Sequence, residues 1–187
     1  LLLMLPNMFK IAGELLPAVF HVSSRSLAYQ SLSIFGDHSD VMAVRGTGFS
    51  LLASGNVQEA QDMAAIAHFA AIESRVPFLH FFDGFRTSNE IQRIEEVDYD
   101  TLKSMVDMES IYKFRKLALN PEHPVLKVGA ENPDVYFQGR EVSNQLYLEL
   151  PNIVKKYLKL FGDKTGRKYK LFDYIGKKDA ENIIISM

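Results

Sequence analysis

An uninterrupted apolar run that stops at an acidic residue and a glycine constrains this chain more than any other feature. The run covers residues 76–82, and Asp83-Gly84-Phe85-Arg86 follows it directly. Short apolar runs bounded by turn signals favour a strand buried on both faces, as in a parallel sheet covered by helices. Ligands of open parallel sheets bind beyond the carboxyl ends of the strands. We therefore expect residues 83–88 to lie on a binding rim.

A second strand-and-turn pattern predicts another position on the same rim. Residues 18–22 form a short β-type run, and Ser23-Ser24-Arg25 begins a turn into a helix predicted through Gln30. Residues 49–53 predict a further strand. Because the predicted strands alternate with helices, the fold class is α/β, with a mainly parallel sheet flanked by helices.

The clearest helix signal follows the turn at residues 54–56. Asn56 is the expected N-cap, and Glu59 stands at the capping-box position. The helix is predicted over residues 57–74, and it carries a face of small residues suited to close packing on a sheet (Ala60, Ala64, Ala67 and Ala71). The remaining expectations are a buried helix or helix end over 1–16, helical stretches over 99–107, 109–119 and 143–161, a proline-rich excursion over 120–140, and a buried strand over 182–187.

Composition narrows the class of protein. The 187 residues suffice for one full domain and a fragment of a second. A net charge of −2 gives no general attraction to nucleic acid or to an anionic membrane, and the cluster Lys164-Arg167-Lys168-Lys170 reads as a solvated helix face. The absence of cysteine excludes disulfides and thiolate-bound zinc or iron–sulfur clusters within these residues.

The two ends of the sequence indicate a piece of a larger protein. The apolar opening, residues 1–5, has no preceding basic region and is too short to span a bilayer, so neither a signal peptide nor a membrane anchor is expected. The apolar end, residues 182–187, would leave a core strand with an unpaired edge, which is a liability in a complete domain.

Arg25 is the leading candidate for a binding residue. A guanidinium is always charged, and its planar fork matches a carboxylate bidentately. At a strand end beside Ser23 and Ser24 it would suit a small 2-oxo acid, although the residues alone favour a surface or salt-bridge arginine. Asp83 either satisfies the backbone amides of its turn or has a functional role, and both interpretations stay open.

The histidines have a structural interpretation. His21 and His80 stand on apolar strands and are expected to be hydrogen-bonded core histidines. His38 lies in Asp37-His38-Ser39-Asp40, where the Asx and Ser side chains favour a loop that caps the next helix, with a role near the active site as the alternative. No spacing typical of a metal site is present, so no metal ligand is predicted in this chain.

Several blocks of the sequence resemble, in family order and over nearly the whole chain, segments of the pyruvate:ferredoxin (or flavodoxin) oxidoreductases. The blocks are Pro6-Asn7-Met8-Phe9-Lys10-Ile11-Ala12-Gly13-Glu14-Leu15, Phe20-His21-Val22-Ser23-Ser24-Arg25, Ser33-Ile34-Phe35-Gly36-Asp37-His38, residues 76–92, Asn132-Pro133-Asp134-Val135-Tyr136-Phe137-Gln138-Gly139-Arg140-Glu141 and Tyr169-Lys170-Leu171-Phe172-Asp173-Tyr174. The resemblance implies an N-terminally truncated domain over residues 1–168, equivalent to the pyrimidine-side domain of thiamine enzymes. Residues 169–187 would then be the first strand region of the following domain.

The resemblance also implies a function. The complete enzyme would oxidatively decarboxylate pyruvate with coenzyme A, giving acetyl-CoA, carbon dioxide and reduced ferredoxin or flavodoxin. It would use thiamine diphosphate, Mg²⁺ and iron–sulfur clusters of the 4Fe-4S type. Arg25 stands where the arginine of the family's Phe-His-Val-x-x-Arg motif contacts pyruvate, and is therefore the predicted catalytic and substrate-binding residue.

Further expectations concern the state of the protein. The family's substrate-contacting threonine loop and the glutamate that hydrogen-bonds the aminopyrimidine ring would precede Leu1. The isolated chain is therefore expected to be inactive and to bind none of these cofactors. The complete protein would be a cytoplasmic homodimer with no nucleic-acid or membrane partner. The alternative is a non-catalytic α/β module whose rim binds a partner or an anionic ligand.

Overall fold

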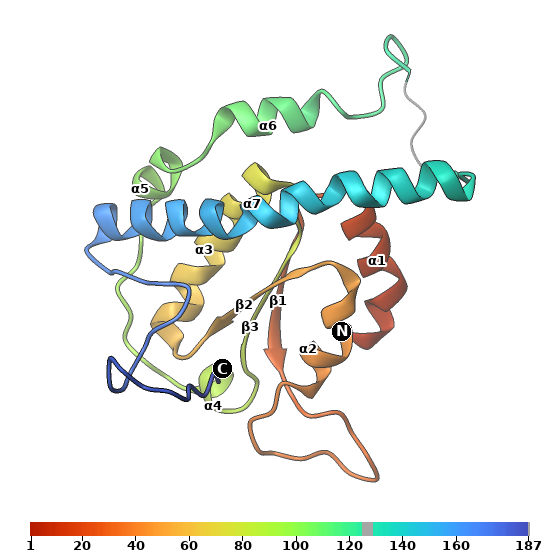
Figure 1. The fold of residues 1–187 in the computed structure, drawn as a ribbon. Helices are drawn as coiled ribbons and strands as arrows, with labels where there is room; N and C mark the ends of the chain where they lie inside the picture. The colour runs from red at the N-terminus through yellow and green to blue at the C-terminus, as the bar shows by residue number, and fades with distance from the viewer. Residues whose placement is uncertain (125–128, 187) are drawn as a thin grey trace.

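Three parallel strands form the centre of the molecule. The computed structural model describes residues 1–124 and 129–186. The sheet has the order β1-β3-β2, where β1 is Val19–Ser24, β2 is Ser50–Ser54 and β3 is Phe78–Asp83. The register pairs Ser24 with Asp83. The strands therefore end together, and the segments that follow β1 and β3 lie at the same lower edge of the sheet (Figure 1).

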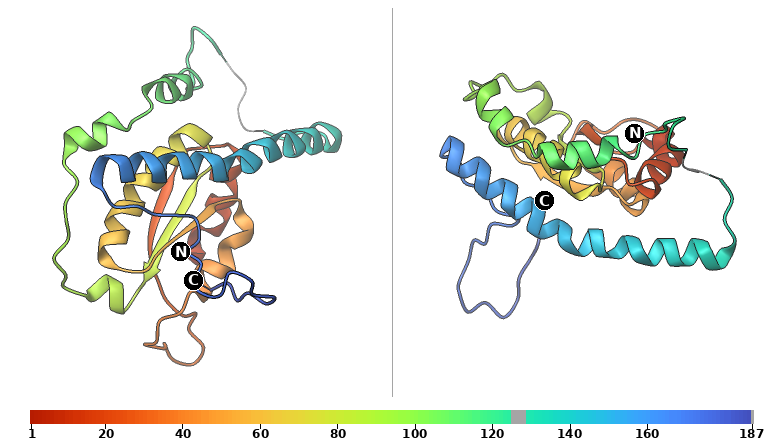
Figure 2. Two further views of the ribbon diagram at one scale, coloured as in Figure 1. Left: turned by 60° about the vertical axis from the view of Figure 1, so that its left-hand side comes forward. Right: turned by 90° about the horizontal axis from the view of Figure 1, so that it is seen from above.

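The predicted central strand is confirmed, because β3 is apolar toward both faces of the sheet. Its first four residues, 78–81, are all buried. On one face, α3 (Val57–Ser74) packs against all three strands, and α7 (Pro133–Thr165) packs on α3. On the other face lie α1 (Leu5–Gly13), which follows the short 3-10 helix η1 (Leu2–Met4), and α2 (Ser39–Val44), which continues into η2 (Arg45–Thr47). Figure 2 shows the sheet between these two layers, with α7 running past its end.

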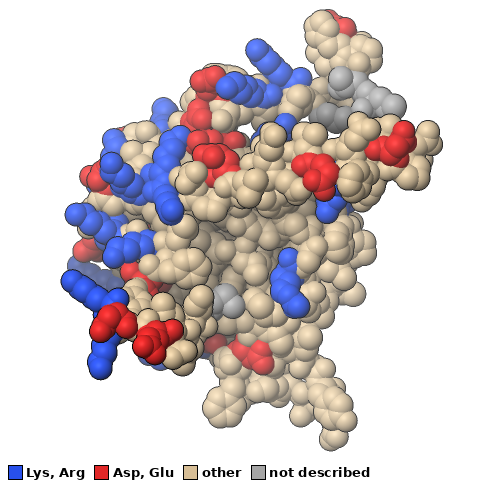
Figure 3. Space-filling view, viewed as in Figure 1, with Lys and Arg blue, Asp and Glu red and all other residues tan. Residues whose placement is uncertain are grey.

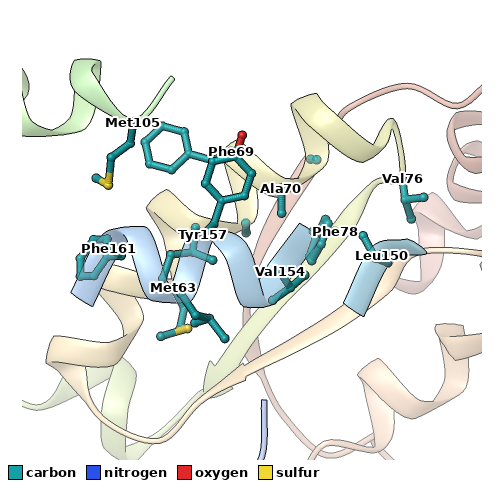
Figure 4. Close-up of a cluster of buried hydrophobic side chains, with 14 residues drawn as sticks. Met63, Phe69, Ala70, Val76, Phe78, Met105, Leu150, Val154, Tyr157 and Phe161 are labelled. Carbon is teal, nitrogen blue, oxygen red and sulfur yellow. The ribbon is translucent and has the colours of Figure 1, made fainter. Parts of the chain in front are cut away.

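Two hydrophobic clusters fill the spaces between the layers. The cluster between β3, α3 and α7 includes Phe78, Phe69 and Tyr157, and the rings of the last two stack with centroids 5.7 Å apart (Figure 4). The cluster on the opposite face includes Leu79 and Phe81 of β3 with residues of α1 and α2. Burial of apolar surface on both faces of one strand is the main force that holds the layers together.

Helix α3 forms where the sequence predicts it. The Asn56 side chain accepts a hydrogen bond of 2.9 Å from the Glu59 N–H, and the Glu59 carboxylate accepts one of 2.8 Å from the Gly55 N–H. These two bonds satisfy donors that a helix start leaves without partners. Ala67 and Ala71 are fully buried in the cluster that contains Phe78. The alanine face therefore allows the close packing that the sequence indicated, although Ala60 and Ala64 are only half-buried.

The remaining helices follow the prediction in part. After α4 (Arg86–Asn89), the predicted pair appears as α5 (Tyr99–Ser104) and α6 (Met108–Arg115). Helix α7 starts at Pro133, although the prediction placed an irregular excursion as far as residue 140. Proline at the first helical position is favourable, because its fixed φ suits a helix and its missing N–H would have no partner there. Residues 125–128 of that excursion lie outside the described part of the chain.

Three further expectations are wrong. Residues 25–30 form no helix, because serine hydroxyls bond the backbone instead, as when the Leu27 N–H donates to Ser39 Oγ over 2.9 Å. The opening segment is not a buried helix: Leu3 is 97% exposed, and only Met8 and Ala12 are buried in α1. Residues 167–186 contain no strand, and Ile184 is 94% exposed. Residue 187 lies outside the described chain.

In residues 1–124 and 129–186, no helix combines the length and apolar character needed to cross a membrane.

Candidate functional site

The carboxyl ends of β1 and β3 are joined by hydrogen bonds, and Arg25 lies at the join. The Gly84 N–H donates to the Ser24 carbonyl over 2.8 Å, and Arg25 Nε donates to the Gly84 carbonyl over 3.0 Å. Arg25 and the residues after β3 therefore share one rim, as predicted. In Figure 1 this rim is the lower edge of the sheet, beside α4 and the loop of residues 25–38.

The guanidinium of Arg25 is held on one side and open on the other. Its Cζ lies 4.8 Å from the centroid of the Phe85 ring, and the Arg25 backbone N–H donates to Asp40 Oδ2 over 3.2 Å. No hydrogen bond or ion pair of Nη1 or Nη2 is found within the described residues. Two guanidinium nitrogens at the end of a parallel strand thus have N–H groups with no acceptor among the described residues, and such a pair can bind an anion bidentately.

A buried network anchors the loop beside Arg25. Ser24 is fully buried, and its hydroxyl donates to Asp40 Oδ1 over 2.7 Å. His38 Nδ1 lies 2.9 Å from the same hydroxyl oxygen and donates to it, since the hydroxyl hydrogen is already engaged. Ser24, His38 and Asp40 do not form a nucleophilic triad, because the serine hydrogen bonds the carboxylate and the buried oxygen is closed to a substrate. Their contacts instead fix the start of α2 to the end of β1.

Asp83 has the structural role that the sequence left open. Its Oδ1 accepts hydrogen bonds from the Phe85 N–H, at 3.0 Å, and from the Arg86 N–H. The carboxylate therefore closes the turn after β3 and faces the backbone. Since no bond joins Asp83 to Arg25, the positive charge of the Arg25 guanidinium is not neutralised from this side.

A chain of imidazoles crosses the α3 face of the sheet. His80 Nε2 lies 2.7 Å from Ser54 Oγ, His80 Nδ1 lies 2.9 Å from His21 Nδ1, and His21 Nε2 lies 3.2 Å from His68 Nε2. Burial, together with the neighbouring His21 and His68, lowers the pKa of His80 to about 4. The prediction of a hydrogen-bonded core histidine is confirmed for His80. His21 is hydrogen-bonded but exposed, and sequence reasoning missed His68, 47 residues away from it.

A second arginine lies at the junction between α3 and the segment after α7. Arg167 donates from Nε to Asp62 Oδ2 over 2.7 Å and from Nη2 to Asp62 Oδ1 over 2.9 Å, and the Tyr169 hydroxyl donates to Asp62 Oδ2 over 2.7 Å. Burial alone would raise the pKa of Asp62, but the hydrogen bonds from Arg167, Tyr169 and Gln61 outweigh it, and the pKa is lowered. The expectation that Arg167 belongs to a solvated face is wrong, because the partner that buries it lies 105 residues earlier in the chain.

Two lysines of that predicted face, Lys168 and Lys170, line a groove that does not include Arg25. The groove has a volume of about 860 Å³ and lies between the last turns of α7 and residues 168–172. Lysine and arginine side chains gather on this side of the molecule in Figure 3. The groove borders none of the rim residues, so we place the candidate site at the rim. The lining residues are Lys155, Leu158, Lys159, Gly162, Asp163, Lys168, Tyr169, Lys170, Leu171 and Phe172.

The side chains of this chain fit an anion better than a metal or a metal cluster. Within residues 1–124 and 129–186, no group of three or more histidines and carboxylates is arranged to hold a metal ion. The sequence has no cysteine, so it offers no thiolate ligand for an iron–sulfur cluster.

Comparison with known proteins identifies the family of the chain. Residues 1–159 match a family model described as pyruvate flavodoxin/ferredoxin oxidoreductase, thiamine diphosphate-binding. Over all 187 residues, the chain is 57% identical to pyruvate-flavodoxin oxidoreductase of Klebsiella pneumoniae and 56% identical to pyruvate:ferredoxin oxidoreductase of Moorella thermoacetica, and it covers 16% of each. It is also 50% identical over 187 residues to a Cryptosporidium parvum protein named pyruvate dehydrogenase (NADP(+)), of which it covers 10%. The chain thus spans only a small part of these relatives.

Proposed function

Because the chain belongs to the pyruvate flavodoxin/ferredoxin oxidoreductase family, we propose that it contributes the pyruvate-binding rim of such an enzyme. The complete protein would convert pyruvate and coenzyme A to acetyl-CoA and carbon dioxide, releasing one proton and passing two electrons to ferredoxin or flavodoxin. The observation that carries this proposal is the open pair of Arg25 nitrogens at the end of β1, which matches the carboxylate of a 2-oxo acid.

The names of the relatives support a role on the pyruvate side of the reaction. Two of them are named for flavodoxin or ferredoxin and a third for NADP(+), while all three are named for pyruvate. The chain stays at least 50% identical across this change of acceptor. We therefore propose that these residues serve pyruvate and that the electron acceptor is selected elsewhere in the polypeptide.

In this proposal, Arg25 binds and orients the substrate carboxylate, while the Ser24–Asp40 contact keeps the strand end in place. Thiamine diphosphate, when bound, supplies the carbanion chemistry of the decarboxylation. The iron–sulfur clusters would be bound by cysteines outside this chain, which has none, and we propose that magnesium is also bound by other parts of the polypeptide.

The organisation of the complete protein is also proposed. We assign residues 1–168 to the domain that carries the rim and residues 169–187 to the beginning of the next domain. The complete enzyme would be a cytoplasmic homodimer that acts without nucleic acid or membrane. The alternative of a non-catalytic binding module is not favoured, because the alignments with named oxidoreductases span all 187 residues at 56–57% identity.

The test is Arg25→Ala in the complete oxidoreductase. Loss of a charge-assisted bidentate contact should lower kcat/KM for pyruvate about 10- to 150-fold, which corresponds to roughly 1.5–3 kcal/mol. Arg25→Lys keeps the positive charge but not the planar guanidinium, so its kcat/KM for pyruvate should lie between those of Arg25→Ala and the unchanged enzyme. Steady-state kinetics with saturating coenzyme A measure both variants, and unchanged kinetics for Arg25→Ala would remove Arg25 from the site.

A further inference from the structure

The side chain of Arg25 is held by the two residues that follow the turn at Asp83. Arg25 Nε donates to the Gly84 carbonyl over 3.0 Å, and the guanidinium carbon lies 4.8 Å from the centre of the Phe85 ring. A cation over an aromatic face is attracted by the ring quadrupole. Since Asp83 fixes the backbone of the same turn, both contacts are set by the end of β3.

Only glycine at position 84 permits this approach. A Cβ atom added there would lie 2.4 Å from the Ser24 carbonyl oxygen and 2.5 Å from Arg25 Cγ. Real Cβ atoms essentially never come so close, and the first clash is with backbone. The Gly84 N–H also donates to the Ser24 carbonyl. The N–H and the carbonyl of Gly84 therefore both bond to residues at the end of β1.

The contact with Gly84 leaves one edge of the guanidinium for a ligand. A carboxylate can pair bidentately either along the edge that contains Nε or across the two terminal nitrogens. In Arg25 the Nε hydrogen is engaged, while Nη1 and Nη2 have no acceptor within the described residues. The carboxylate of Asp40 bonds the Arg25 backbone N–H and the Ser24 hydroxyl, and no bond from it to these nitrogens is found within the described residues.

We propose that Gly84 and Phe85 are positioning residues that aim Arg25, so that the carboxylate of a small 2-oxo acid binds end-on across Nη1 and Nη2. The class of ligand follows from the proposed function, and the direction of binding follows from the Arg25 contacts. Phe85 holds the plane of the guanidinium and does not itself bind substrate. Removal of the Phe85 ring should therefore weaken pyruvate binding only through its effect on Arg25.

The experiment compares four variants of the complete oxidoreductase: Arg25→Ala, Phe85→Leu, Phe85→Tyr and the double variant Arg25→Ala/Phe85→Leu. Phe85→Leu removes the aromatic face at similar volume and should raise the KM for pyruvate about two- to five-fold. The KM for coenzyme A and the thermal midpoint should stay unchanged. Phe85→Tyr keeps the aromatic face and should restore the KM for pyruvate. Gly84→Ala is not used, because its clash with the Ser24 backbone would disturb the sheet.

The double variant separates positioning from a structural role. If Phe85 acts through Arg25, adding Phe85→Leu to Arg25→Ala should change the KM for pyruvate no further. The proposal is overturned if Phe85→Leu alone leaves this KM unchanged, or if its effect is fully additive with that of Arg25→Ala. Either result, with Arg25→Ala still impaired, leaves the proposed function standing. An unimpaired Arg25→Ala enzyme would instead contradict the proposed function and this inference together.

Discussion

Two arginines of this chain both lie over a phenylalanine ring, but only one of them is paired with carboxylates. Arg25 lies 4.8 Å from the ring of Phe85, and Arg167 lies 5.5 Å from the ring of Phe161. All three guanidinium nitrogens of Arg167 donate to carboxylates of Asp62 and Glu95, whereas Arg25 uses only Nε, toward a carbonyl. An arginine saturated by its own protein stabilises the fold. An arginine that keeps charged donors free at a strand end remains available for a ligand, which is the role proposed for Arg25.

The difference extends to charge. The carboxylate of Asp62 is completely buried and compensates the charge of Arg167. At the rim, Asp40 and Asp83 lie near Arg25, but hydrogen bonds with backbone groups and the Ser24 hydroxyl occupy them. The two regions should therefore respond differently to the same substitution: removal of Arg167 should affect stability, and removal of Arg25 should affect substrate binding.

The largest effect is expected for Arg167→Ala. This substitution leaves the Asp62 charge buried and uncompensated, which should destabilise the fold by about 3–5 kcal/mol. Urea denaturation of the purified chain, followed by circular dichroism, measures the change. The matched control is Arg25→Ala, which loses the bond to the Gly84 carbonyl but leaves no buried charge uncompensated, and it should cost only about 1 kcal/mol. Equal losses for both variants would contradict the distinction between the two arginines.

The next effect is a loss of stability in mild acid, caused by His80, which is buried and has no carboxylate beside it, among the described residues, to stabilise its protonated form. The pKa of His80 is lowered from 6.5 to about 4, so the unfolded chain binds a proton in a range where the folded chain does not. The contribution of His80 to the free energy of unfolding should therefore be fully present above pH 6.5. It should be lost as the pH falls to about 4, by about 3 kcal/mol in total. Denaturant midpoints measured across this range test the prediction. His80→Gln should flatten the decline, and an equally steep curve in that variant would exclude His80 as its cause.

Asp62 should act in a separate window at lower pH. Because its pKa is lowered from 3.8, its contribution to stability is present above that value and is lost as the pH falls further. In Arg167→Ala this low-pH loss should shrink, since the hydrogen bonds that stabilise the carboxylate are gone. The same midpoint measurements, extended below pH 3.8, give the comparison. A low-pH loss of the same size in both proteins would show that Arg167 does not set the titration of Asp62.

The smallest effect is expected for Glu95→Ala. Glu95 accepts a bond of 3.1 Å from Arg167 Nη1, but its side chain is 80% exposed, so solvent and salt screen the pair. Its removal should cost about 0.2–1 kcal/mol in a urea titration at low ionic strength, and less at high salt. The backbone contacts of Glu95 with Gln58 and Gln61 do not depend on the carboxylate and should persist. A loss as large as that of Arg167→Ala would mean that the exposed contact, and not Asp62, stabilises the junction.

The sequence predicted the features that depend on neighbouring residues. The β3 strand follows from an apolar run, the start of α3 follows from Asn56 and Glu59, and the position of Arg25 on the rim follows from a strand that ends in a polar turn. The sequence did not predict contacts between distant residues. The partner of Arg167 lies 105 residues away, and charge alone made this arginine look solvated. The sequence predicts a helix after Arg25, but the structure has a loop there. The serine hydroxyls that bond the loop backbone produce no periodic pattern in the sequence.

The imidazole chain on the α3 face has one more consequence, which concerns tautomers. The Ser54 hydroxyl donates to the Glu59 carbonyl over 3.2 Å, so His80 must donate to it from Nε2. His80 Nδ1 is then an acceptor, which places the hydrogen of His21 on Nδ1 and that of His68 on Nε2. A buried serine thus determines, through two intervening rings, that Nδ1 is the basic nitrogen of the exposed His68.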